Sequence, residues 1–222
     1  MVTPVGHWPV WQWWQKPGAV RSLFHLFYQR SAGPQGNEQT FGHAWSPNLL
    51  DWAVDTLAFA VDATPWNSAH VWAPSIIQYG NRYYMFYTGV DANEDQRIGY
   101  TSTAQIDTTN TVWDSPRVMV LEASNTSWAV PDPWMYSGQT QFRDAYVFDD
   151  PEHPGQLLMV YAGLDSIDFN ANSGSLAVGV ARSSPESLDA WEDLGFFPST
   201  LRRTTHVGQL EGPHMFPVNG TN

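Results

Sequence analysis

The feature that most constrains the fold of this chain is a repeated pattern of short strand-like segments. Residues 23–29, 83–89 and 157–163 each form an apolar run with a tyrosine near its end. Each run is followed by a glycine-containing segment that ends in serine, and then by a tryptophan. Successive equivalent tyrosines are 59 and 74 residues apart, and successive equivalent tryptophans are 61 and 78 apart. Both spacings increase by similar amounts, as expected of true repeats with loop insertions. The landmarks are Tyr28, Tyr87 and Tyr161, and Trp52, Trp113 and Trp191.

Repeats of this size predict the blades of a β-propeller, because one small sheet cannot bury both of its faces alone. No segment shows a convincing helical period. We therefore expect an all-β fold of the β-propeller type, with blades of four antiparallel strands near residues 20–60, 72–115 and 142–192. The innermost strand of each blade should precede its tyrosine-containing strand. An ordinary antiparallel sandwich is the alternative.

The last part of the sequence predicts the beginning of a fourth blade. Residues 211–220 match the opening of the second unit at 72–81, since both begin with a tripeptide that ends in proline. We therefore expect residues 1–222 to form a single partial propeller of about three blades plus the first strand of a fourth. Closed propellers have at least four blades. The third blade would expose an apolar face, and we expect self-association through that edge.

Charge and composition narrow the class of partner. The chain has 10 basic and 22 acidic residues, for a formal net charge of −12, which disfavours nucleic acid and anionic membrane surfaces. A neutral carbohydrate meets no such penalty, and the 12 tryptophans can supply flat surfaces for stacking on sugar rings. Cysteine is absent, and the seven histidines show no metal-ligand spacing. We therefore expect neither a metal nor another cofactor.

Four short motifs give a specific resemblance. They are Gly-His-Ala-Trp-Ser at 42–46, Trp-Ala-Pro at 72–74, Phe-Arg-Asp at 142–144 and Leu-Glu-Gly-Pro at 210–213. In this order they resemble the five-bladed β-propeller glycoside hydrolases. The first, third and fourth are similar to motifs of the invertase and levansucrase families, and the second and fourth to motifs of the arabinanase and β-xylosidase families. The resemblance covers about residues 5–220.

This resemblance implies a glycoside hydrolase that acts on fructosides or on arabinose- or xylose-containing glycosides. Glu211 would be the catalytic acid, and burial at the start of an inner strand would raise its pKa. Asp144 would bind sugar hydroxyls and stabilise the positive charge of the transition state. Arg143 should not simply pair with Asp144, because neighbouring strand residues point to opposite faces. The expected substrate-binding residues are Arg143, Trp8, His7, Trp72, His70 and His214.

The sequence departs from these families at the expected nucleophile. Gly6 stands where the levansucrase-like pattern has its nucleophilic aspartate, and Trp8 stands where the arabinanase pattern has one. The first acidic residue of the chain is Glu38. The alternative interpretation is therefore a non-catalytic propeller that binds carbohydrate but has lost its nucleophile.

Overall fold

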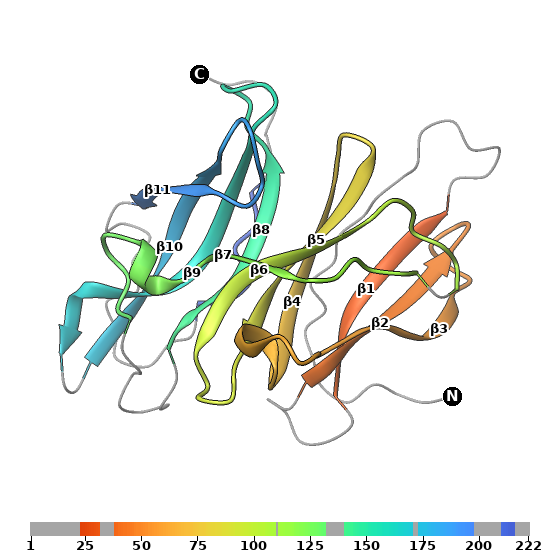
Figure 1. Ribbon diagram of the computed structural model, residues 1–222, viewed down its shortest axis with the longest axis horizontal. Coiled ribbons are helices and arrows are strands. Elements are labelled where there is room, and N and C mark those ends of the chain that lie inside the picture. The colour runs from red at the N-terminus through yellow and green to blue at the C-terminus, as the bar shows by residue number, and fades with distance from the viewer. Residues whose placement is uncertain are drawn as a thin grey trace.

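The computed structural model describes residues 23–31, 38–109, 111–131, 140–170, 173–197 and 210–215. The strands in these ranges form three antiparallel sheets (Figure 1). Sheet A has the strand order β1-β2-β3, sheet B the order β4-β5-β6-β7, and sheet C the order β11-β10-β9-β8. The strands are β1 Phe24–Ser31, β2 Glu38–Ser46, β3 Ala53–Ala60, β4 His70–Tyr79, β5 Arg82–Val90, β6 Gln96–Thr103, β7 Val118–Leu121, β8 Phe142–Asp149, β9 Leu157–Asn170, β10 Ser173–Ser183 and β11 Trp191–Phe196.

Helix is confined, in the described ranges, to two 3₁₀ segments of three residues each. These are η1 (Pro65–Asn67), which precedes sheet B, and η2 (Ala123–Asn125), which precedes sheet C. Within the described part of the chain, no helix is long and apolar enough to span a membrane.

The predicted blades correspond to the three sheets. Sheets B and C each have four antiparallel strands, and their edge strands β4 and β8 precede and pair with the tyrosine-containing strands β5 and β9, as predicted. In sheet A the tyrosine-containing strand is β1, and the strand predicted before it falls on residues outside the described ranges. Residues 210–215 are described, but no strand is assigned to them, so the predicted first strand of a fourth blade is not found there.

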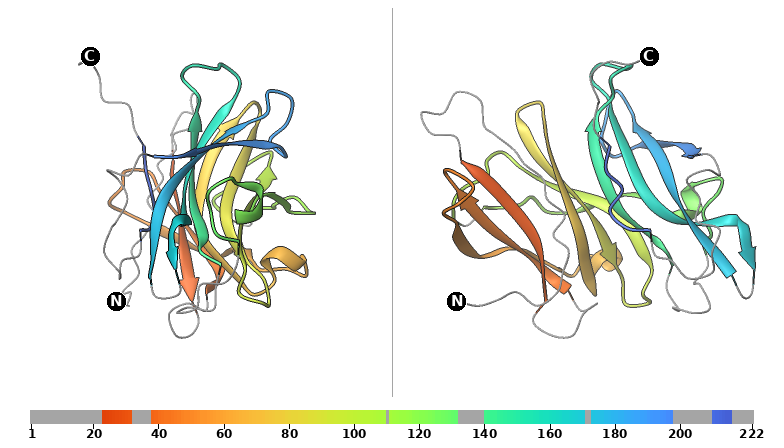
Figure 2. Two further views of the ribbon diagram at one scale, coloured as in Figure 1. Left: turned by 90° about the vertical axis from the view of Figure 1, so that its left-hand side faces the viewer. Right: turned by 180° about the vertical axis from the view of Figure 1, so that it is seen from behind.

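The sheets lie side by side in chain order, as the blades of a propeller do (Figures 1 and 2). The edge strands β4 and β8 are neighbours: the backbone N–H of Val147 on β8 donates to the hydroxyl of Ser75 on β4 at 3.2 Å. Near the start of β8, the backbone N–H of Asp144 donates to Thr88, which pairs with Trp72 on β4.

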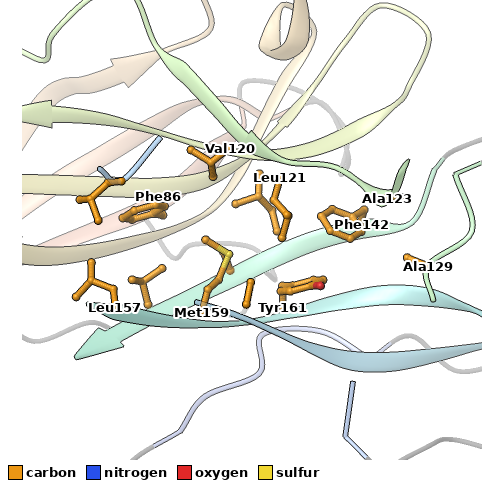
Figure 3. Packing of buried hydrophobic residues seen from close by; sticks show 14 of the residues in the cluster. Phe86, Val120, Leu121, Ala123, Ala129, Phe142, Leu157, Met159 and Tyr161 are labelled. Carbon is orange, nitrogen blue, oxygen red and sulfur yellow. The ribbon is translucent and has the colours of Figure 1, made fainter. Parts of the chain in front are cut away.

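The hydrophobic core lies between neighbouring sheets. The larger cluster joins sheets B and C, with Phe86 and Leu121 on one side and Phe142, Met159 and Tyr161 on the other (Figure 3). A second cluster joins sheets A and B and includes Phe41, Phe59 and Tyr87. Alternating apolar residues along each strand face these clusters, which is how sheets that are individually too small become stable.

A tryptophan precedes sheet B and another precedes sheet C, and each packs on glycines of the sheet that follows it. The ring of Trp66 lies so close to Gly89 and Gly99 that an added Cβ would approach it within 2.2 and 2.4 Å. Trp128 packs in the same way on Gly163 and Gly179, where the distances would be 2.7 and 2.4 Å. The repeated glycine therefore makes room for an indole ring. Each ring also stacks on the landmark tyrosine of its sheet, with centroid distances of 5.2 and 5.9 Å.

Candidate active site

Asp144 lies near the start of edge strand β8 in an unusual backbone conformation. Its φ is +62°, in the left-handed region that residues with a side chain rarely adopt, and the register between β8 and β9 shifts at this point. Its backbone N–H donates to the hydroxyl of Thr88 on β5 at 2.9 Å. Its carboxylate accepts a hydrogen bond from the backbone N–H of Gly212 at 3.0 Å. Asp144 is therefore held from both sides, by sheet B and by the segment 210–215.

The same left-handed kink occurs in two other places. Ala73, near the start of β4, has a φ of +48°, and Gly212 has a φ of +57°. Each of the three kinked residues is the middle residue of a matching tripeptide: Trp-Ala-Pro, Arg-Asp-Ala and Glu-Gly-Pro. The kink is therefore a repeated element of this fold. It places Trp72, Arg143 and Glu211 at equivalent positions of three successive segments.

Arg143 is almost completely buried beside Asp144. Its Nη1 donates to the side-chain oxygens of Gln96, at 3.2 Å, and of Gln141. Its Nε and Nη2 make no hydrogen bond within the described residues. Nε lies 3.9 Å from the carboxylate of Asp144, and Nη2 lies 3.6 Å from that of Glu211. The guanidinium therefore has two buried donors free, and both face the two carboxylates.

Arg143 does not simply pair with Asp144, since it also faces Glu211 and makes no hydrogen bond to Asp144, but the alternation of faces given as the reason is wrong. Side chains alternate between faces only in a regular strand. The left-handed Asp144 and the register shift interrupt that alternation, so both side chains are buried and approach each other within 4 Å.

Electrostatics make Asp144 the unusual carboxyl of the site. Burial raises its pKa to about 6, and the negative charge of Glu211 acts in the same direction. The positive charge of Arg143 and the Gly212 N–H oppose the shift without cancelling it. Burial therefore outweighs the charge of the adjacent guanidinium.

The expected burial of Glu211 is also wrong, because 54% of its side chain is exposed. Its carboxylate nevertheless lies beside Nη2 of Arg143, so the structure does bring Glu211, Arg143 and Asp144 together.

Trp72 and His70 lie on β4, one sheet away from Asp144. Trp72 is half-buried and pairs across the sheet with Thr88, the residue that binds the Asp144 backbone. His70 is buried and stacks on Trp72 at 5.8 Å, and its Nε2 lies 3.7 Å from the Glu94 carboxylate. These contacts place Trp72 in the same neighbourhood as the kink of β8.

Of the remaining predicted residues, the structure describes one, His214, which lies outside this cluster. His214 is exposed and packs against Tyr146 at 4.5 Å. His7, Trp8 and Gly6 lie outside the described residues. No group of three histidine, cysteine, aspartate or glutamate residues that could hold a metal ion occurs in the described ranges.

Sequence reasoning missed the residues that hold the site from other strands. Gln96 accepts hydrogen bonds from the backbone N–H of Phe142, at 3.1 Å, and from Arg143, while Thr88 holds Asp144. No local motif marks these residues, because their partners are about 50 residues away in the chain. One available signal was the repeat itself: Thr88 directly follows the landmark Tyr87, as Gln29 follows Tyr28.

The sequence matches a known protein family and one curated relative. The model of the glycosyl hydrolases family 32 N-terminal domain matches residues 15–222. A sucrose-6-phosphate hydrolase of Pediococcus pentosaceus is 31% identical over 102 residues, which cover 45% of this chain and 20% of that protein. The chain thus spans about a fifth of the curated relative that it matches.

Solved structures share the fold at low sequence identity. A full-length β-fructofuranosidase from Microbacterium saccharophilum has a TM-score of 0.65 at 16% identity, covering 90% of this chain and 47% of the other. A levansucrase from Gluconacetobacter diazotrophicus has a TM-score of 0.66 at 17% identity, covering 98% of this chain and 59% of the other. At these identities the likeness concerns the fold.

Proposed function

Because the chain belongs to glycosyl hydrolase family 32, we propose that it binds fructosides and takes part in cleaving their glycosidic bond, with Asp144, Arg143 and Glu211 at the reacting sugar. The observation that carries this proposal is the cluster of these three residues. A kinked, buried carboxyl lies beside a buried guanidinium with two free donors, and a second carboxylate lies on its other side.

The chemistry of glycoside cleavage assigns a different role to each residue. The reaction needs a carboxylic acid that protonates the leaving oxygen, and Glu211, being open to solvent, can receive a new proton in each cycle. Asp144, when ionised, would accept hydrogen bonds from sugar hydroxyls and stabilise the positive charge that develops at the anomeric carbon. Nε and Nη2 of Arg143 would donate to sugar oxygens and so gain the hydrogen-bond partners that they lack among the described residues.

Several observations favour a neutral fructoside as the substrate. The family match and the solved fructosidase and levansucrase structures support fructosides, and the net charge of −12 disfavours anionic ligands. Trp72 would offer an apolar face to the sugar. Arabinose- and xylose-containing glycosides are the second class to test, because the Trp-Ala-Pro motif resembles that of the arabinanases.

A non-catalytic carbohydrate-binding protein is the second candidate. It is favoured by the absence of any acidic residue before Glu38, since the resemblance places the nucleophile in the first few residues. Glu38 itself is buried on β2, the second strand of sheet A as described. Without a nucleophilic carboxylate the chain would bind its sugar and cleave it very slowly.

The two candidates are separated by measuring binding and cleavage on the same variants. We expect calorimetry to show binding of sucrose or 1-kestose by the unmodified chain and by Glu211→Gln, and weaker binding by Asp144→Asn. Release of fructose should fall by about 10² to 10⁴ in Glu211→Gln if the chain is an enzyme. Gly6→Asp should raise it if the nucleophile has been lost.

Glu192→Gln is the matched control, because Glu192 is an exposed glutamate on β11. It should leave both binding and cleavage unchanged. Absence of binding to every fructoside, or binding only to arabinan or aryl-xylosides, would contradict the proposal.

A further inference from the structure

We propose that Thr88 is a positioning residue for the candidate site, and that it acts through a chain of hydrogen bonds that links the kinks at Asp144 and Gly212. The consequence for catalysis rests on the proposed function. The positioning itself does not, because it concerns contacts within the protein.

The first step is the bond between Thr88 and Asp144. A left-handed conformation at a residue with a side chain is unfavourable and persists only where surrounding contacts hold it. The shift in register deprives the Asp144 N–H of a regular partner in β9, and the hydroxyl of Thr88 accepts it instead at 2.9 Å. Thr88 is fully buried, so water has no easy access to replace that hydroxyl.

The second step is that the same device occurs one sheet earlier. The backbone N–H of the kinked Ala73 donates to the side-chain oxygen of Gln29 at 3.0 Å. Gln29 follows Tyr28 in sheet A just as Thr88 follows Tyr87 in sheet B. In both cases the residue after the landmark tyrosine holds the kink of the next edge strand.

The third step explains why the next kink differs. The residue after the landmark Tyr161 is Ala162, whose side chain has no hydrogen-bond acceptor. The kinked residue that follows is Gly212, which adopts a positive φ at little cost, and its N–H donates to the Asp144 carboxylate. The Asp144 side chain therefore accepts the backbone N–H of the kinked Gly212, just as the Thr88 side chain accepts that of the kinked Asp144.

One buried hydroxyl, that of Thr88, therefore affects the positions of both candidate carboxylates. Thr88 fixes the backbone of Asp144, Asp144 fixes the backbone of Gly212, and Gly212 is bonded directly to Glu211 in the chain. Loss of the hydroxyl should let Asp144 relax from its kink. Its carboxylate would then lose the Gly212 N–H, and Glu211 would move relative to Arg143.

Two variants separate the hydroxyl from the volume of the side chain. Thr88→Val removes the acceptor and keeps the shape, whereas Thr88→Ser keeps the acceptor and removes the methyl group. We expect Thr88→Val to raise the titration midpoint of the Asp144 carboxyl, because the ionised form loses a hydrogen bond. NMR on ¹³C-labelled aspartate measures this midpoint. In fructoside assays kcat should fall at least tenfold, whereas Thr88→Ser should behave like the unmodified chain.

The controls distinguish this proposal from the proposed function. Gln29→Leu removes the equivalent acceptor at Ala73 and should leave the Asp144 titration unchanged. If the unmodified chain binds no sugar, the proposed function fails, but the titration still tests the role of Thr88. Equal titrations of Thr88→Val and Thr88→Ser would overturn the proposal. If Thr88→Val does not fold, amide hydrogen exchange in the unmodified chain decides: protected Asp144 and Gly212 amides support the proposal, and rapid exchange at both overturns it.

Discussion

At the scale of single residues, Asp144 combines two unfavourable features, a left-handed backbone and a buried carboxyl. Such features are common where a protein holds a group for function at the expense of stability. Arg143 and the Gly212 N–H favour the ionised carboxylate, yet burial keeps the pKa near 6. The protonated form is therefore the one that folding favours, and the ionised form is the one that would bind sugar hydroxyls.

This conflict predicts how Asp144→Asn changes stability with pH. Because the folded pKa of about 6 lies above the ordinary aspartate value of 3.8, the contribution of Asp144 to stability is complete below pH 3.8 and is lost as the pH rises through 6. The variant should be close to the unmodified chain near pH 3.5 and more stable by up to about 3 kcal/mol above pH 7. Urea unfolding at both pH values measures this. A difference that does not depend on pH would contradict it, and Asp149→Asn, at an exposed position on the same strand, should show little effect.

The sequence pointed to the three residues at the centre of the candidate site but not to their surroundings. Arg143, Asp144 and Glu211 stand in recognisable local motifs, so their proximity could be expected. The burial of Glu211 was predicted wrongly because exposure depends on packing between segments, which a local pattern does not contain. Gln96 and Thr88 were missed for the same reason, since each acts across the boundary between two sheets.

At the scale of elements, the sequence landmarks proved reliable for counting sheets and less informative about packing. The tyrosines and glycines correctly predicted the paired strands β5 and β6 in sheet B and β9 and β10 in sheet C. Alternating apolar residues and glycine are local signals, so the sequence shows them directly. The tryptophans that pack on those glycines are Trp66 and Trp128, not the landmark tryptophans. They lie in the connections before each sheet, where no periodic pattern identifies them.

The contact between Trp128 and Gly163 predicts a coupled pair of substitutions. A Cβ at Gly163 would lie 2.7 Å from the indole ring of Trp128, so Gly163→Ala should destabilise the fold by about 1–3 kcal/mol. In a Trp128→Leu background the smaller side chain leaves room, and the same substitution should cost clearly less. Denaturant unfolding of the two single variants and the double variant gives the coupling free energy. Simple additivity would show that the ring is not what excludes the methyl group.

A pair of histidines predicts acid sensitivity of sheet A. Nδ1 of His25 on β1 lies 2.9 Å from Nε2 of His43 on β2, and the rings are parallel. Burial and the neighbouring His43 lower the pKa of His25 to about 4, although Asp107 opposes the shift. Burial also lowers the pKa of His43, against the opposing effect of Asp55. The neutral pair is therefore the form that fits the fold.

Because the folded pKa of His25 lies below the ordinary histidine value of 6.5, the contribution of His25 to stability is present above pH 6.5 and is lost as the pH falls through 4. We expect His25→Gln, which keeps a hydrogen-bonding side chain, to flatten the decline of the melting temperature over this interval. Thermal unfolding followed by circular dichroism at closely spaced pH values tests this. An unchanged decline in the variant would assign the acid sensitivity to other groups.

At the scale of the whole molecule, stability depends on contacts between sheets. Residues at odd positions of β9 and β10, such as Met159 and Ala181, face sheet B and belong to the larger core cluster. Residues at even positions face the other way. Among the described residues, that second face of sheet C carries a small cluster of Val130, Leu164 and Leu176, with Leu210 against it.

The second face of sheet C predicts self-association of the 222-residue chain. Leu158, Val178 and Val180 lie on this face and are only half-buried, so pairing with a second copy would remove apolar surface from water. We expect the average mass in light scattering to rise with protein concentration. Val180→Lys should reduce association, because it places a charge in the contact, whereas Val54→Lys, at a position 66% exposed on sheet A, should not. A monomer at every concentration with a sharp thermal transition would contradict the prediction. It would mean that this face is sufficiently covered within a single chain.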